Sequence, residues 1–196
     1  IKSSAASDVY KRQDHRHAII HACLPTAEGM EICRQYHILL PVQSAFINWP
    51  QEPDAYLEEI LGERSARLNP LRDFADRGIV LSAGSDGPCT DPDPIQWIHR
   101  ACNHSQPEQS LSLYEALRMC TYNGYYTSFD EAGRGSLEVG KIADMVILSK
   151  NPYEIDRAAL NTLRVNQLLL QGKPYRKLKR NPIAHLLRGM RKAKNA

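Results

Sequence analysis

Two polar residues, His21 and Asp86, each follow a short apolar run that is typical of a buried β-strand. The run at residues 18–20 ends directly at His21, and the run at residues 79–81 leads into the turn that contains Asp86. In parallel α/β folds, ligands bind at the carboxyl ends of the strands. We therefore expect both side chains to lie where such a fold carries its chemistry.

Asp86 is bracketed by Gly84 and Gly87 and is followed by Pro88. Glycines allow tight or left-handed backbone geometry, which would expose the carboxylate at the mouth of the sheet. A carboxylate in that place can bind a divalent metal and accept a proton from water. Asp-Gly-Pro is also ordinary turn chemistry, so a helix N-cap or a turn-stabilising role is an equal alternative on spacing alone.

The histidines are weaker candidates when each is taken alone. His21 has two possible roles. A neutral imidazole at a strand end suits a zinc ligand, yet a lone histidine in an apolar setting is more often a hydrogen-bonded core residue. His15 and His17 resemble a His-x-His metal pair, because alternate residues of a strand face one side, but they precede the apolar run. The remaining candidates are expected to be structural or solvent-facing: His37, His99 and His104.

The elements that would position these residues alternate between strand and helix up to about residue 128. Strands are expected at residues 18–20, 38–42 and 79–81, with helical segments at 26–35, 56–61, from 69 to 78, and at 94–102. This alternation predicts parallel strands with helical crossovers. After Gly133 the pattern changes to strands and turns, with strands at residues 144–148 and 165–170, which suggests a small second β element.

Two helix starts are marked by specific residues. Asn69 and Pro70 fit an N-cap and a first helical position, and Gly78 fits the end of the same helix. Ser112 and Glu115 have the spacing of a capping box. Both patterns fix helix boundaries independently of any functional interpretation.

Composition limits the class of protein. The chain has 196 residues with 42% hydrophobic content, which fits one globular domain with a small extension, and no apolar run approaches the roughly 20 residues of a membrane helix. No phosphate loop, dinucleotide-binding glycine motif or nucleophile elbow is present. The five cysteines are odd in number and form no Cys-x-x-Cys pair, so we expect reduced thiols in a cytoplasmic protein.

The two ends of the chain differ from the body. Residues 1–13 lack a clear period and are interpreted as a disordered or foreign leader. From Gln171 onward nine Lys and Arg residues occur without a single acid, and residues 176–196 form a basic tail. The tail matches no nucleic-acid-binding module, so we expect a solvated or partner-docking segment rather than nucleic-acid binding.

Several runs occur together in one order. They are residues 19–22 around His21, residues 84–88 leading to Asp93-Pro94, residues 112–117, and the Gly-Ser-Leu-Glu-x-Gly-Lys-x-Ala-Asp run within residues 133–148. This set resembles the amidohydrolase superfamily, most closely its amidohydrolase-3 branch, over about residues 14–175. The last run is the most specific of the set.

The resemblance implies an α/β fold: the C-terminal portion of a (β/α)8 TIM-type barrel at residues 14–130, followed by strands of a small β-sandwich at 131–175. On this basis His21 ends the sixth barrel strand, Val42 lies near the end of the seventh, and Asp86 follows the eighth. His21 would be a ligand of a divalent metal, usually zinc. Asp86 would contact the metal as well and would carry a proton from the hydrolytic water to the leaving nitrogen.

The implied activity is metal-dependent hydrolysis of a carbon–nitrogen bond outside ordinary peptides, in a small-molecule amide. Deamination is a close variant of this reaction. A homo-oligomer is a possible assembly. Many relatives carry an acid where this chain has Ile20 and a tryptophan where it has Gly87, which affects the substrate side. The family's other metal ligands precede this chain, so we expect it to be inactive alone. The alternative is a non-catalytic interaction module whose basic tail binds a partner or nucleic acid.

Overall fold

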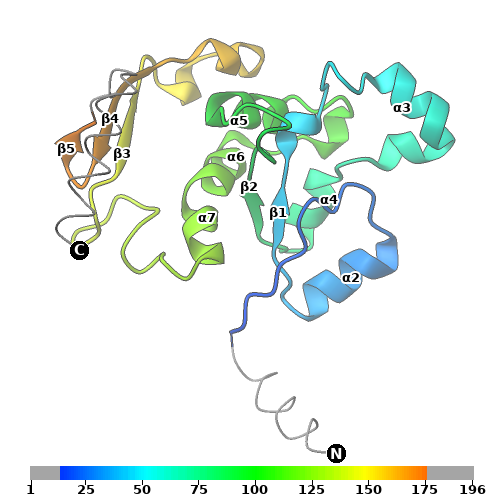
Figure 1. Ribbon diagram of the computed structural model, residues 1–196, viewed down its shortest axis with the longest axis horizontal. Helices are drawn as coiled ribbons and strands as arrows, with labels where there is room; N and C mark the ends of the chain where they lie inside the picture. The colour runs from blue at the N-terminus through cyan, green and yellow to red at the C-terminus, as the bar shows by residue number, and fades with distance from the viewer. Residues whose placement is uncertain (1–13, 176–196) are drawn as a thin grey trace, which may run out of the picture.

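The computed structural model describes residues 14–175, which form an α/β part and a separate small antiparallel sheet (Figure 1). The predicted leader at residues 1–13 and the predicted basic tail at 176–196 lie outside the described residues. The mixed α/β character expected from the sequence is confirmed.

The α/β part is built on parallel pairing. Strand β1 (Leu40–Val42) pairs in parallel with β2 (Leu81–Ala83). On the other side of β1, residues 18–21 run in the same direction and form a parallel bridge between Ala18 and Leu39. The predicted parallel arrangement is confirmed, with β1 in the middle of three aligned segments and with paired regions shorter than the apolar runs suggested.

The predicted burial of residues 18–20 is wrong. Ile19 is 47% exposed and Ile20 is 63% exposed. In the described part of the chain, the backbone of this segment bonds across only to the residues around β1, with Ile19 N donating to Leu39 O at 3.0 Å and His21 N to Pro41 O at 2.9 Å. The segment is therefore an open edge, and its apolar side chains face solvent because nothing in residues 14–175 covers them.

The first helices follow the sequence expectation closely. Helix α2 (Ala27–Gln35) is capped by Thr26, whose hydroxyl accepts a hydrogen bond from Gly29 N at 3.0 Å. Helix α3 (Asp54–Leu61) and a 3₁₀ segment (Gly62–Arg67) occupy the long connection between β1 and β2. These elements carry the chain away from the sheet and back to it (Figure 1).

Asn69 is not the N-cap of the next helix. Helix α4 (Leu71–Asp76) begins after Pro70, and no side chain caps it. Asn69 has a left-handed backbone (φ 50°), and its N–H donates to Cys23 O at 2.7 Å. The predicted start is wrong by one residue because the Asn69 backbone serves a tertiary hydrogen bond instead of the helix end.

Three helices follow β2: α5 (Pro94–Cys102), α6 (Leu113–Cys120) and the short α7 (Tyr122–Thr127). The predicted bounds of α5 and the capping box of α6 are confirmed, with Ser112 N donating to Glu115 Oε2 at 2.8 Å. Among the helices of residues 14–175, none is both long enough and apolar enough to span a bilayer.

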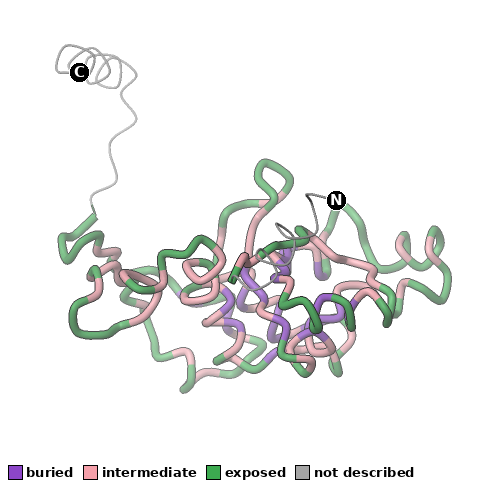
Figure 2. The backbone as a smooth tube through the Cα atoms, turned by 90° about the horizontal axis from the view of Figure 1, so that it is seen from below, coloured by how far each residue is buried: buried purple, intermediate pink, exposed green. Residues whose placement is uncertain are grey.

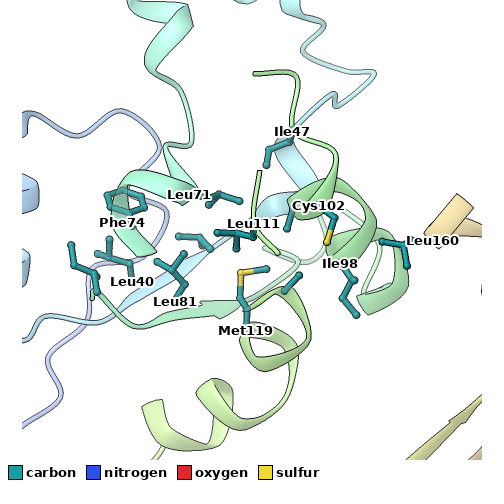
Figure 3. Close-up of a cluster of buried hydrophobic side chains, with 14 of the residues drawn as sticks. Leu40, Ile47, Leu71, Phe74, Leu81, Ile98, Cys102, Leu111, Met119 and Leu160 are labelled. Carbon is teal, nitrogen blue, oxygen red and sulfur yellow. The ribbon is translucent and has the colours of Figure 1, made fainter. Parts of the chain in front are cut away.

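The hydrophobic core lies between the parallel strands and the helices packed on them (Figure 3). Leu40 and Leu81 from the sheet meet Phe74 of α4 and Met119 of α6, and all four are at most 4% exposed. The buried stretches gather in the middle of the molecule, whereas both ends are mostly exposed or half-buried (Figure 2). The sheet is thus held rigidly from the helical side, which fixes the ends of its strands.

The second sheet contains β3 (Met145–Leu148), β4 (Val165–Leu170) and β5 (Lys173–Pro174), all antiparallel. The predicted strands at 144–148 and 165–170 are confirmed, and a turn at residues 171–172 joins β4 to β5. Arg157 ties the connection between β3 and β4 to the core, donating to Cys102 O and Leu111 O. Within the described residues this is a single sheet, so a sandwich stays a prediction.

Candidate functional site

His21 and Asp86 lie at the same end of the parallel sheet. His21 closes the first segment where its N–H donates to Pro41 O at 2.9 Å. Asp86 follows β2 after Gly84, whose N–H donates to Val42 O at 3.1 Å. Because the paired segments are parallel, their carboxyl ends point the same way, and both side chains stand at the edge where ligands bind in such folds.

Gln43, which the sequence did not single out, lies between them. It directly follows β1 and is only 5% exposed. Its side-chain Oε1 is 2.6 Å from His21 Nδ1, within hydrogen-bond distance. On its other side, a Cβ at Gly84 would come within 3.3 Å of Gln43 Nε2. One buried amide therefore links the ends of all three parallel segments, and the available signal was its position right after a strand.

The turn around Asp86 leaves its carboxylate exposed. Asp86 itself, rather than a neighbouring glycine, takes the left-handed backbone conformation, with φ 52°. At Gly84, an added Cβ would be in tight contact with the Gln43 amide, at 3.3 Å from Nε2. Cys89 N donates to Asp86 O at 2.8 Å, and the negative charge of Asp86 raises the pKa of the Cys89 thiol.

The alternative of Asp86 as a helix N-cap is wrong. Asp93 holds that position for α5, and its Oδ1 accepts hydrogen bonds from Ile95 N at 3.0 Å and Gln96 N at 3.4 Å. Within the described residues, the Asp86 carboxylate interacts with the Cys89 thiol and with no backbone N–H. The other half of the alternative is confirmed for the backbone, since Asp86 opens the turn at residues 86–89 and its O accepts from Cys89 N.

An aromatic row extends from the site into a groove. The His21 and Phe46 rings stack with centroids 6.1 Å apart, and Phe46 is 5.2 Å from Trp49. The groove has a volume of about 290 Å³ and lies between the connections that follow β1 and β2, with Trp49, Trp97 and Cys89 among its lining residues. A flat or apolar group of a small molecule would fit there, and Cys89, whose thiol interacts with Asp86, connects this groove to the site.

Arg100 fixes one wall of this groove. Its guanidinium donates to Ala45 O and to Ile47 O, the latter at 3.0 Å, and burial lowers its pKa. The hydroxyl of Ser44 also reaches α5, donating to Trp97 O at 2.9 Å. These bonds hold the connection that carries Gln43 and Phe46 against helix α5, so the site residues after β1 are rigidly placed.

The other histidines are not brought to this site. His15 and His17 stack on each other with ring centroids 4.2 Å apart, as expected for alternate residues facing one side. His104 is buried, donates from Nε2 to Asn69 O at 3.0 Å and accepts from Gln106 N at Nδ1, so its predicted structural role is confirmed. His37 is exposed, and His99 lies near Asn103 in α5.

The donors present are of the kind that binds divalent metals. An imidazole and a carboxylate are both common zinc ligands. In the part of the chain that the structure describes, no group of three or more His, Cys, Asp or Glu side chains is arranged to hold a metal ion. His21 and Asp86 are thus side chains of a suitable type at one end of the sheet, and residues 14–175 form no metal-binding cluster by themselves.

The model of the amidohydrolase family matches residues 4–175, a range that begins within the segment interpreted as a leader. The chain belongs to the amidohydrolase family. This confirms the resemblance inferred from the ordered motifs around His21 and Asp86.

Individual relatives are moderately similar to this amidohydrolase chain. YtcJ of Bacillus subtilis is 26% identical over 164 residues, covering 79% of this chain and 31% of that protein. An N-substituted formamide deformylase of Arthrobacter pascens is 31% identical over 113 residues, covering 54% of this chain and 21% of the relative. The chain thus spans less than a third of the length of these relatives.

Solved structures share the fold. An adenosine deaminase from Xanthomonas campestris with bound zinc superposes with a TM-score of 0.64 at 20% identity, covering 97% of this chain and 44% of that structure. An uncharacterized metal-dependent hydrolase from Pyrococcus furiosus gives a TM-score of 0.56 at 24% identity, covering 70% and 29%. At these identities the similarity establishes the fold and leaves the substrate open.

Proposed function

We propose that this chain carries part of the active site of a metal-dependent hydrolase that cleaves carbon–nitrogen bonds in small molecules. The observation that carries the proposal is the alignment of His21, Gln43 and Asp86 at the carboxyl ends of three parallel segments. Membership of the amidohydrolase family supports it. So do two relatives named for carbon–nitrogen chemistry, the formamide deformylase and a 5-methylthioadenosine/S-adenosylhomocysteine deaminase of Caldanaerobacter subterraneus.

We further propose that residues 14–130 are the last part of a (β/α)8 barrel. Residues 18–21, β1 and β2 would be its sixth, seventh and eighth strands, and β3–β5 would belong to a small β-sandwich. The exposed edge at Ile19 and Ile20 supports this arrangement, because closing a barrel needs a further parallel strand there. The activity would then belong to a longer polypeptide, and this chain alone would be inactive.

In this proposal His21 has one task and Asp86 has two. His21 and Asp86 would hold a divalent metal, most simply zinc, which when bound would act as a Lewis acid on the substrate and on water. Asp86 would accept a proton from the attacking water and return it to the leaving nitrogen. The groove beside Cys89 would bind the substituent on one side of the scissile bond, with Trp49 and Trp97 as flat walls.

The test uses a longer polypeptide that contains this chain and a complete barrel, compared with this chain alone. Both are loaded with Zn²⁺, and release of formate, ammonia or a free amine is followed with N-substituted formamides, aminopurine nucleosides and N-acyl amino acids. We expect turnover of at least one class by the longer protein only, with stoichiometric metal. A longer protein that folds, yet binds no metal and hydrolyses none of these compounds, would overturn the proposal.

A further inference from the structure

We infer that Gln43 is a positioning residue that holds His21 in one tautomer and thereby presents its second ring nitrogen to the site. The inference about the ring stands on geometry alone, and its consequence for a metal rests on the proposed function. The two side chains come from different segments, and the amide is 5% exposed, so the contact is protected from competing water.

The hydrogen bond decides where the ring proton lies. The atoms in contact, 2.6 Å apart, are His21 Nδ1 and Gln43 Oε1. An amide oxygen can only accept, so with Oε1 facing the ring the proton lies on Nδ1, which donates it. In a neutral imidazole the other nitrogen, Nε2, then holds a free lone pair. Among the described residues no hydrogen bond engages His21 Nε2, so this lone pair is available to a ligand.

The surroundings of Gln43 explain why the amide stays in place. The backbone carbonyl O of Gln43 accepts a hydrogen bond from Phe46 N at 3.0 Å. The next residue, Ser44, is bonded to α5, because its hydroxyl donates to Trp97 O. On the far side the amide nitrogen lies against Gly84, where an added Cβ would come within 3.3 Å of Nε2. The backbone is fixed on one side and the amide is confined on the other.

His21 is itself held in an unusual conformation. Its backbone has φ 73°, in the left-handed region that residues other than glycine seldom adopt. Such geometry is unfavourable for a residue with a side chain and persists only where the surrounding structure enforces it. The His21 N–H bond to Pro41 O and the ring bond to Gln43 together supply that enforcement.

A merely structural Gln43 makes a different prediction. If the amide served only to fill space, it could turn so that its nitrogen donates to Nδ1, and the proton would then lie on Nε2. The tautomer of His21 therefore separates the two roles. Removing a residue that hydrogen-bonds to a metal-binding histidine and orients its ring typically lowers metal affinity by about 10- to 100-fold.

The first experiment needs no activity and no variant at Gln43. The chain is labelled with ¹⁵N-histidine, and the His21 ring is identified among the seven histidines by its loss in His21→Asn. Ring ¹⁵N shifts are recorded in alkaline buffer, where imidazole side chains are neutral. We expect the protonated-nitrogen shift on Nδ1 and the lone-pair shift on Nε2; the reverse assignment would overturn the inference.

The second experiment compares variants. Gln43→Glu keeps a hydrogen-bond acceptor and should keep the His21 tautomer, whereas Gln43→Met should give a mixture of both tautomers. The control is Gln106→Met, at a partly buried glutamine whose side chain donates to Ser65 O. In the longer protein, Zn²⁺ affinity should fall about 10- to 100-fold in Gln43→Met and little in Gln43→Glu. If Gln43→Met leaves the Zn²⁺ affinity unchanged, the positioning role is overturned. If the wild-type protein binds no zinc, the proposed function is overturned, and the tautomer measurement alone then tests whether Gln43 orients the His21 ring.

Discussion

Arg16 and Glu131, 115 residues apart in the chain, form an ion pair in which Arg16 Nη2 lies 2.6 Å from Glu131 Oε1. The Arg16 guanidinium also lies over the Tyr126 ring at 3.8 Å and the Phe129 ring at 4.3 Å, and its side chain is only 9% exposed. This contact anchors the residues that precede His21 to the end of helix α7. The open edge segment is thereby held to the core from its own N-terminal side.

Arg16→Met should therefore destabilise the fold, since it removes the ion pair and the contacts with both rings. Arg34→Met is the matched control, because Arg34 pairs with Glu31 on the surface and its side chain is 51% exposed. We expect thermal unfolding of Arg16→Met to begin roughly 5 °C or more below the wild type and Arg34→Met to stay within about 2 °C of it. Equal midpoints for the two variants would show that the anchor contributes nothing.

His104 should make the stability of the chain depend on pH. Burial lowers its pKa, and its Nδ1 accepts from Gln106 N, so the folded state favours the neutral ring. The unfolded chain then takes up a proton near pH 6.5 while the folded chain does not. The contribution of His104 to the free energy of unfolding is complete above pH 6.5. It is lost as the pH falls below that value and through the pKa of His104 in the folded state.

The measurement is urea unfolding between pH 7.5 and 5.5. His104→Gln should show a smaller loss of stability across this range than the wild type, whereas His37→Gln, at an exposed histidine, should leave the slope unchanged. His99, whose pKa is also lowered by burial, will contribute a remaining slope. A His104→Gln slope identical to that of the wild type would contradict this assignment.

Leu40 should be among the most sensitive positions of the core. It is 1% exposed and lies in β1 beneath the candidate site. Leu40→Ala should cost about 2–5 kcal/mol of unfolding free energy, because it removes buried methyl groups and leaves a cavity. Leu137→Ala, at a leucine that is 80% exposed, should cost under about 0.5 kcal/mol, and similar costs for both would argue against this core.

Features encoded by neighbouring residues were predictable from the sequence. The capping box at Ser112 and Glu115, the bounds of α5 and the strand β4 follow from residue types a few positions apart, and all three are confirmed. Local capping and periodicity depend on chemistry within one element. The same is true of the expectation that Asp86 follows a strand, whereas the described segment before His21 forms only an isolated parallel bridge at Ala18.

Features that depend on distant partners were not predictable. Residues 18–20 read as a buried strand, but they are exposed because no described segment covers them. Asn69 does not cap α4 as expected, because its backbone N–H donates to Cys23 O. Gln43 belongs to the candidate site only because its side chain contacts His21, which is 22 residues away. Such contacts arise from the fold and leave no local periodicity or spacing in the chain.

The most direct test of the account is the effect of Asp86→Asn on turnover in a longer, active protein that contains this chain. Asp76→Asn is the control, because Asp76 is an exposed acid at the end of helix α4 and does not line the groove. We predict that Asp86→Asn lowers kcat by about 100- to 10,000-fold with the fold intact, since the amide cannot accept the proton, while Asp76→Asn keeps kcat within a few fold. A folded Asp86→Asn protein that turns over its substrate at the wild-type rate would contradict the central claim.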